Sequence, residues 1–160
     1  MTEALQGSLI PDGETGTVRM EDRFDTGVSD LWAAITEPER LARWIGAVAG
    51  DFRVGGELTA RFTSSWEGTM RVEVCDGPHH LMVRSFDGED ETVTEAVLTE
   101  DGTGTRLVIE ERGLPIGVLP DHGAGWQAHL EDLDALLAGR PASDWRTRWQ
   151  QLIPEYRPTA

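Results

Sequence analysis

Two side chains of this sequence are candidates for an acid–base pair, Glu111 and His129. Glu111 ends a strand-like segment in which Leu107 and Ile109 face inward, and strict alternation places its carboxylate on the same side. His129 flanks an apolar helical stripe and can point into the same space. A carboxylate and an imidazole that converge in an apolar cup bind a polar group of a ligand or exchange protons with it. The alternative is structural, with Glu111 solvated or ion-paired at the rim and His129 on the flank of a helix.

Other catalytic patterns are weaker in this sequence. His79 and His80 are adjacent, so on a strand they point to opposite faces. His122 and His129 are seven residues apart, about 10 Å along a helix, and cannot share one ion. The single cysteine, Cys75, excludes an internal disulfide and a cysteine-rich metal site. We therefore predict no metal site and no cofactor.

The elements that must position Glu111 begin with a half-buried strand over residues 17–25, where apolar and polar residues alternate. The stretch from Leu31 to Ile45 predicts an amphipathic helix and a second short helix that begins at Pro38. Strand-like segments then follow over residues 52–62, 66–74, 80–86, 92–99 and 105–112. The glycine pair at residues 55–56 indicates a bulge within the first of them. Strands at this spacing predict an antiparallel meander.

A long helix follows the strands. Trp126, Leu130, Leu133 and Leu137 recur at helical spacing, and Gly139 ends the helix. A helix with one apolar face must lie across a sheet, here on its concave side. The fold class is therefore α+β: a curved antiparallel sheet of about six or seven strands wrapped around a long C-terminal helix, with two short helices after the first main strand.

Three parts are predicted along the chain. Residues 1–16 form an N-terminal segment with room for a short extra strand, residues 17–139 form the main domain, and residues 140–160 form a docking helix and tail. In that last part Trp145, Trp149 and Leu152 make an apolar stripe that is unfavourable to leave in water. The helix can dock on its own domain or on a second copy, which would give a homodimer.

A broad apolar cavity between sheet and helix is the predicted binding site. Its expected lining is Trp66, Met70, Met82, Phe86, Ile109, Glu111, Trp126, His129, Leu130 and Leu133. Of the other tryptophans, Trp32 and Trp44 are expected to pack the small helices, and Trp145 and Trp149 to attach the C-terminal segment. Aromatic walls with few polar groups suit a small hydrophobic or aromatic ligand.

Composition excludes some classes of partner. The formal net charge of −15 over 160 residues argues against nucleic acid and anionic membrane surfaces, because both require a basic footprint. The sequence has no apolar run near the length of a membrane span and no basic-then-apolar N-terminal segment. We expect a cytoplasmic protein.

The order of strand, two small helices, meander and long helix resembles the helix-grip superfamily of START-like (SRPBCC) domains. Within it, the sequence is similar to the family named after the activator of the heat-shock-protein ATPase. The similarity rests on Trp32, Ile35-Thr36-Glu37-Pro38, Leu41, Trp44, Phe52-Arg53-Val54-Gly55-Gly56, Glu67-Gly68, Val72-Glu73-Val74, Pro78, Leu81, Gly104-Thr105-Arg106-Leu107, Gly125-Trp126, Leu130 and Leu133. The resemblance implies a chaperone partner and a part in the stress response, or small-molecule binding, since most single-domain relatives are described as small-molecule-binding or are uncharacterised.

Three hypotheses follow. The first is a non-enzymatic protein that binds a hydrophobic or aromatic molecule. The second is a cyclase- or hydrolase-type enzyme with Glu111 and His129 as acid and base. The third is an interaction module that acts on a chaperone ATPase, which an exposed apolar patch without a cavity would favour.

Overall fold

The computed structural model describes residues 7–87 and 90–157 and has a curved, eight-stranded antiparallel sheet at its centre. The strands are β1 (Gly7–Asp12), β2 (Thr15–Phe24), β3 (Gly46–Gly50), β4 (Glu57–Phe62), β5 (Glu67–Asp76), β6 (His80–Asp87), β7 (Asp90–Asp101) and β8 (Gly104–Pro115). The helices are α1 (Val28–Thr36), α2 (Pro38–Leu41), the 3₁₀ turn η1 (Ile116–Val118), α3 (Leu119–Leu137) and α4 (Trp145–Tyr156). The predicted α+β helix-grip class is confirmed, with slightly more strands than expected.

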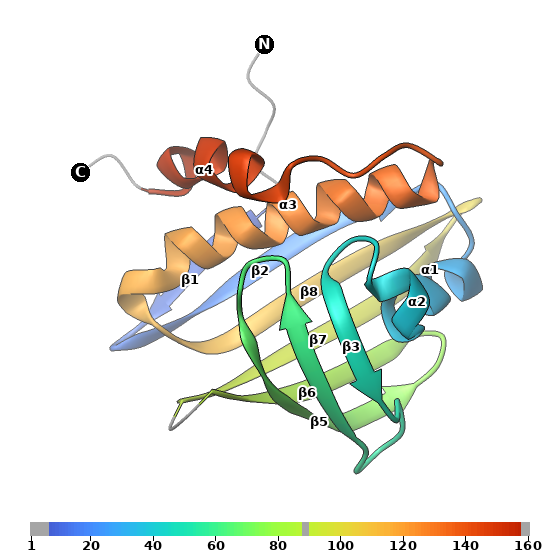
Figure 1. The fold of residues 1–160 in the computed structure, drawn as a ribbon, viewed down its shortest axis with the longest axis horizontal. Helices are drawn as coiled ribbons and strands as arrows, with labels where there is room; N and C mark the ends of the chain where they lie inside the picture. The colour runs from blue at the N-terminus through green and yellow to red at the C-terminus, as the bar shows by residue number, and fades with distance from the viewer. Residues whose placement is uncertain (1–6, 88–89, 158–160) are drawn as a thin grey trace.

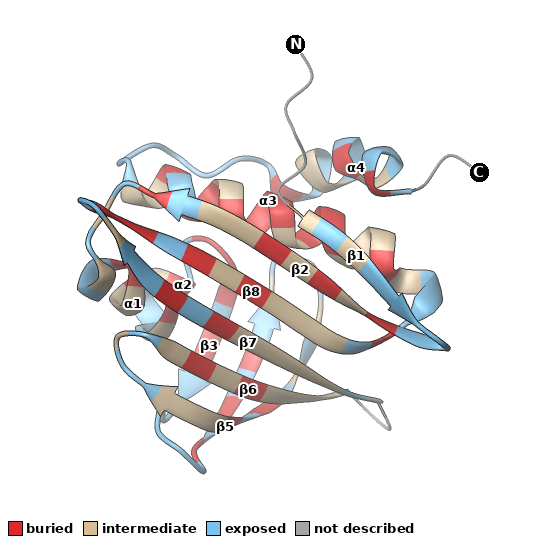
Figure 2. Ribbon diagram, turned by 180° about the vertical axis from the view of Figure 1, so that it is seen from behind, coloured by how far each residue is buried: buried red, intermediate tan, exposed pale blue. Residues whose placement is uncertain are grey.

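The sheet has the order β1-β2-β8-β7-β6-β5-β4-β3 and curls around α3, which crosses its concave face (Figure 1). Helix α4 lies on the outer side of α3, and the short helices α1 and α2 lie together at one end of the molecule. Figure 2 shows the convex face from behind, with buried and less buried positions mixed along β2 and β8, and with intermediate and exposed positions on β1. Among the described residues, no helix has the length and apolar character needed to cross a membrane.

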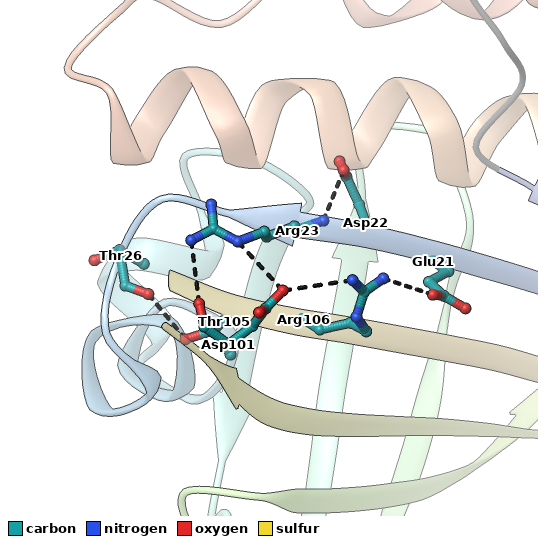
Figure 3. Close-up of polar contacts among 7 residues, drawn as sticks. All are labelled: Glu21, Asp22, Arg23, Thr26, Asp101, Thr105 and Arg106. Atoms are coloured by element: carbon teal, nitrogen blue, oxygen red, sulfur yellow. Dashed lines mark hydrogen bonds and ion pairs between the residues drawn. The ribbon is translucent and has the colours of Figure 1, made fainter. Parts of the chain in front are cut away.

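Alternation along β2 separates the core from a charged outer face. Val18, Met20 and Phe24 are fully buried. Between them, Arg19, Glu21 and Arg23 point outward and join ion pairs that run across neighbouring strands. Arg106 on β8 lies 2.7 Å from Glu21 and 3.4 Å from Asp101, which in turn pairs with Arg23 at 3.3 Å (Figure 3). The outer side of β2 is therefore charged, and its buried apolar side chains belong to the concave side of the sheet.

The prediction of one bulged strand over residues 52–62 is wrong in detail. A separate strand β3 precedes it, and the two glycines lie in the loop between β3 and β4. Gly55 has φ +83°, and a Cβ on Gly56 would lie 2.2 Å from the Asp51 carbonyl oxygen. The loop is held to β5 by hydrogen bonds from Gly55 N to Val72 O and from Val72 N to Gly56 O. The glycines thus permit a tight loop rather than a bulge.

Helix α3 ends at the predicted glycine. Gly139 has φ +73°, Gly139 N donates to Leu136 O, and Arg140 N donates to Ala135 O at 2.7 Å. These two bonds are the Schellman arrangement that satisfies the last carbonyls of a helix. The chain then reverses direction and returns along α3 as α4 (Figure 1).

Helix α4 packs on α3 of the same chain. Ala124 and Ala128 provide a small-residue surface, against which Trp145, Leu152 and Tyr156 are buried. The Tyr156 hydroxyl donates to Gln127 Oε1 at 2.6 Å and accepts from Gly7 N at 3.1 Å. These bonds join α4 to both α3 and β1. Arg148 adds a charged contact to Glu131 at 2.6 Å.

Candidate functional site

A cavity of about 750 Å³ lies between the concave face of the sheet and α3. Most of its wall is apolar, with contributions from α1, β4, β5, β6, β7 and β8 as well as from α3 and α4. Ligand pockets in proteins are typically about 300–1,000 Å³, mainly apolar, with a few placed polar groups. The cavity therefore has the size and character of a small-molecule site.

The predicted site residues divide into three groups. Those that line the cavity are Trp66, Met70, Ile109, Glu111, Trp126 and His129. Met82 and Phe86 do not line it: Leu81, Val83 and Ser85 of the same strand do, so alternation turns Met82 and Phe86 to the opposite face. There Met82 lies near Arg112, and Phe86 lies under the Arg71 guanidinium. Leu130 and Leu133 are buried in the packed core and do not line the cavity.

Glu111 anchors a polar cluster on the cavity wall. It lies near the end of β8, and its side chain is only 13% exposed. Helix α3 places His122 in its first turn and Trp126 one turn later, which puts both on the same face. His122 Nδ1 lies 3.1 Å from Glu111 Oε1, and Trp126 Nε1 donates to the same oxygen at 2.9 Å. The structure thus brings Glu111 together with His122, whereas the sequence prediction paired it with His129.

The Glu111 carboxylate changes the acidity of His122. Burial alone would lower the pKa of this imidazole, but the hydrogen bond and charge of Glu111, helped by the charge of Asp121, raise it above its usual value. A raised pKa favours a protonated His122 beside the Glu111 carboxylate. The pair is then close to neutral overall, which reduces the cost of holding a carboxylate against an apolar cavity.

His129 lies on the cavity wall in a different environment. Its side chain is buried, and Nδ1 lies 3.2 Å from the Trp44 carbonyl oxygen. Desolvation lowers the pKa of His129 to about 4, despite the opposing effect of that hydrogen bond. The ring stacks on Trp145 at 4.9 Å and has edge contacts with Trp44, Phe62 and Trp126 at 6.2–6.5 Å. A neutral imidazole with Nδ1 as donor therefore lies within an aromatic cluster.

Three tryptophans assigned only to packing also form part of the cavity wall: Trp44, Trp145 and Trp149. Trp145 and Trp149 stack on each other at 5.6 Å, and Trp149 Nε1 donates to the Asp121 carbonyl oxygen at 2.9 Å. The helical stripe in residues 145–152 indicates an apolar face but does not show what that face covers. Trp145 and Trp149 both attach α4 to α3 and line the cavity, because α4 docks on α3 next to the cavity.

The cavity carries no evident metal site. In residues 7–87 and 90–157, no three His, Cys, Asp or Glu side chains are grouped so that they could hold an ion. What the polar cluster offers instead is hydrogen bonding and proton exchange through a carboxylate and an imidazole.

An open, curved antiparallel sheet that holds a long helix over a ligand-sized cavity defines a START-like, helix-grip domain. Sequence comparison identifies the family within this class. The chain belongs to the family described as "Activator of Hsp90 ATPase homolog 1-like protein", which matches residues 25–138. The match ends before α4, so Trp145 and Trp149 of the cavity wall lie beyond it. A search of curated proteins finds no match.

Solved structures share the fold over most of the chain. The crystal structure of CalU16 from Micromonospora echinospora has 28% sequence identity and a TM-score of 0.74, over 96% of this chain and 93% of that one. EF2215 from Enterococcus faecalis, a conserved protein of unknown function, has 20% identity and a TM-score of 0.77, over 94% and 88%. DynU16, described as belonging to the dynemicin biosynthetic locus, has 23% identity and a TM-score of 0.73, over 82% of this chain and 50% of that longer one.

Proposed function

We propose that this protein binds a small hydrophobic or aromatic molecule in the cavity between the sheet and α3. The observation that carries the proposal is the cavity itself, about 750 Å³ in volume and lined by aromatic and aliphatic side chains. Unfilled apolar space of this size loses packing contacts, so a domain gains stability when an apolar ligand fills it. The family fold supports the same reading.

The cavity also favours this function over a protein-interaction role. An interaction module is expected to expose a large apolar patch. Among the described residues, the most exposed large apolar side chains are Ile10, Val54, Val97 and Ile116, which lie in β1, the β3–β4 loop, β7 and η1. Ligand binding is therefore the function that the geometry supports best.

The test uses a substitution that fills part of the cavity and a control substitution that adds the same group outside it. Thr94 lies on the cavity wall, directly opposite Glu111 on the neighbouring strand, whereas Val97 of the same strand is 40% exposed. Thr94→Trp places an indole in the cavity, and Val97→Trp places the same group in solvent. We expect Thr94→Trp to weaken binding of methylpyrene at least tenfold, with binding by Val97→Trp unchanged.

Binding is measured by energy transfer from tryptophan emission to the pyrene ring, and folding of each variant is checked by urea denaturation. Equal binding by both variants would locate the pyrene outside the cavity and contradict the proposal. An equal loss of pyrene binding in both variants would also contradict the proposal, because the solvent-facing indole of Val97→Trp does not enter the cavity.

A second candidate, acid–base catalysis, is favoured by the 3.1 Å approach of His122 Nδ1 to Glu111 Oε1 at the cavity wall. An enzyme of this kind would remove a proton from carbon next to a carbonyl group of a bound ketone. In deuterium oxide, tetralone should then exchange its α-protons faster with the wild type than with His122→Asn. Exchange at the buffer rate with both proteins would exclude this candidate and leave binding as the function.

A further inference from the structure

Among the described residues, hydrogen-bond partners approach one of the two oxygens of the Glu111 carboxylate. Both His122 Nδ1 and Trp126 Nε1 approach Oε1. Within the described residues, nothing donates to Oε2, and the one fully buried polar side-chain atom without a partner is Trp145 Nε1. Because Oε2 is unpaired yet not sealed off, and Glu111 lines the cavity, this oxygen is accessible from the ligand side.

Three of the five tryptophans on the cavity wall donate their indole N–H within the protein, and that of Trp145 is fully buried. Trp44 Nε1 donates to the Ala34 carbonyl oxygen at 2.9 Å, Trp126 Nε1 to Glu111, and Trp149 Nε1 to the Asp121 carbonyl oxygen. His129 follows the same pattern, because Nδ1 is used by the Trp44 carbonyl and Nε2 keeps its lone pair. Near Glu111, the carboxylate Oε2 and His129 Nε2 can only accept, whereas the Thr94 hydroxyl opposite Glu111 can accept or donate. The two groups that can only accept call for a ligand that donates.

The charge around the site restricts which hydrogen-bond donor a ligand can carry. Glu67 and Asp121 also line the cavity, and the chain has a net charge of −15, so an anionic ligand is disfavoured. His122 lies beside the carboxylate and balances its charge when protonated, so a cation is not required. A neutral hydroxyl group satisfies Oε2 without adding charge to an apolar cavity.

The shape of the ligand follows from the stacked rings. His129 lies 4.9 Å from Trp145 at an interplanar angle of 29°, and Trp145 lies 5.6 Å from Trp149 at 13°. Aromatic rings pack well against such flat surfaces in offset or edge-to-face arrangements. We propose that the cavity selects a hydroxylated aromatic molecule whose hydroxyl group donates a hydrogen bond to Glu111 Oε2. This inference rests on the proposed binding function and names its ligand class.

Three pyrene derivatives with one ring system test the inference. Hydroxypyrene offers a donor, methoxypyrene only an acceptor, and pyrene carboxylate an anion. Each is titrated into the full chain, with binding followed by energy transfer from tryptophan. We expect hydroxypyrene to bind at least about tenfold more tightly than methoxypyrene, the effect of one hydrogen bond to a charged acceptor. Pyrene carboxylate should bind most weakly.

Glu111→Gln tests the assignment to this residue, since it keeps the side-chain shape but replaces an acceptor oxygen by a donor amide. The preference for hydroxypyrene should disappear in this variant. Glu110→Gln is the matched control, because Glu110 neighbours Glu111 in sequence but pairs with Arg19 and Arg112 away from the cavity. It should keep the full preference.

The outcomes separate this inference from the function on which it rests. Equal affinities of hydroxypyrene and methoxypyrene for the wild type, or a preference that survives in Glu111→Gln, would overturn the hydroxyl anchor and leave cavity binding in place. Tighter binding of the carboxylate would also overturn it. Failure of all three compounds to bind would refute both. The wild-type series stands as a test by itself should Glu111→Gln fold poorly.

Discussion

Two glycines of α3 face α4 at different distances, and replacing each by alanine tests how closely the helices pack. A Cβ on Gly123 would lie 2.8 Å from Tyr156 Cδ1 and 3.0 Å from Leu9 Cδ2. A Cβ on Gly125 would have Trp145 Cζ2 as its nearest neighbour, at 3.4 Å, an ordinary contact. The Tyr156 ring has little freedom to move away, because its hydroxyl is held by two hydrogen bonds.

The magnitudes follow from two opposing effects. Alanine is favoured over glycine inside a helix by about 1 kcal/mol, and this gain applies at both positions. At Gly125 most of it should remain, so Gly125→Ala should stabilise the protein by about 0.5–1 kcal/mol. At Gly123, overpacking costs about 1–3 kcal/mol, so Gly123→Ala should be neutral to destabilising by about 2 kcal/mol.

Urea denaturation measures both free energies of unfolding against the wild type. Equal stabilisation by the two substitutions would show that α4 does not rest on α3. Trp145 and Trp149 would then no longer be part of the cavity wall, and the aromatic surface proposed for the ligand would be lost.

Two further predictions concern buried polar groups. Tyr156→Phe removes the hydroxyl that bonds Gly7 N and Gln127 Oε1, so the free energy of unfolding should fall by about 1–3 kcal/mol in urea; an unchanged midpoint would contradict this docking. Burial lowers the folded-state pKa of His129 to about 4, so its contribution to stability is complete above about pH 6.5, the unfolded value, and is lost as the pH falls through about 4. Between about pH 7 and pH 4 the free energy of unfolding of the wild type should therefore fall by about 2–3 kcal/mol more than that of His129→Phe. The opposite contribution of His122 is present in both proteins and cancels in this comparison. Parallel pH profiles of the two proteins would refute the prediction.

The sequence predicts the helices and most of the sheet because their signals are local. The α3 stripe ends at a glycine that adopts the left-handed conformation, and the alternation in β2 marks the buried face of a strand. Strand β3 is different. Its sequence, from Gly46 to Gly50, is short and rich in glycine and alanine, so it has almost no amphipathic pattern. Only pairing with β4 makes it a strand.

The errors in the candidate site have a similar cause. Strand β6 carries apolar side chains on both faces, so alternation alone does not tell Met82 and Phe86 from Leu81 and Val83. Ser85, the polar residue among them, lies on the cavity wall. Such a strand can be assigned to a face only from its register with its neighbours.

Which histidine lies beside Glu111 depends on the residue at which α3 begins. With a start at Leu119, His122 occupies the first turn and reaches Glu111, whereas His129 lies about two turns further along. Pro120 in the first turn is a signal that could have located this start, because proline is favoured there. The inward direction of Glu111 itself followed from alternation along β8.

The six tryptophans of the chain provide the most direct test of ligand binding in the cavity. Their indole N–H groups give separate resonances in a nitrogen–proton correlation spectrum, which can be recorded during titration with hydroxypyrene. The tryptophans on the cavity wall are Trp44, Trp66, Trp126, Trp145 and Trp149. Trp32 packs beside Gly77 and is not part of the wall, so it serves as an internal control. The account predicts that the resonances of the cavity tryptophans shift, with Trp126 among the largest, and that Trp32 stays in place. A shift of Trp32 with the cavity indoles unchanged would contradict it.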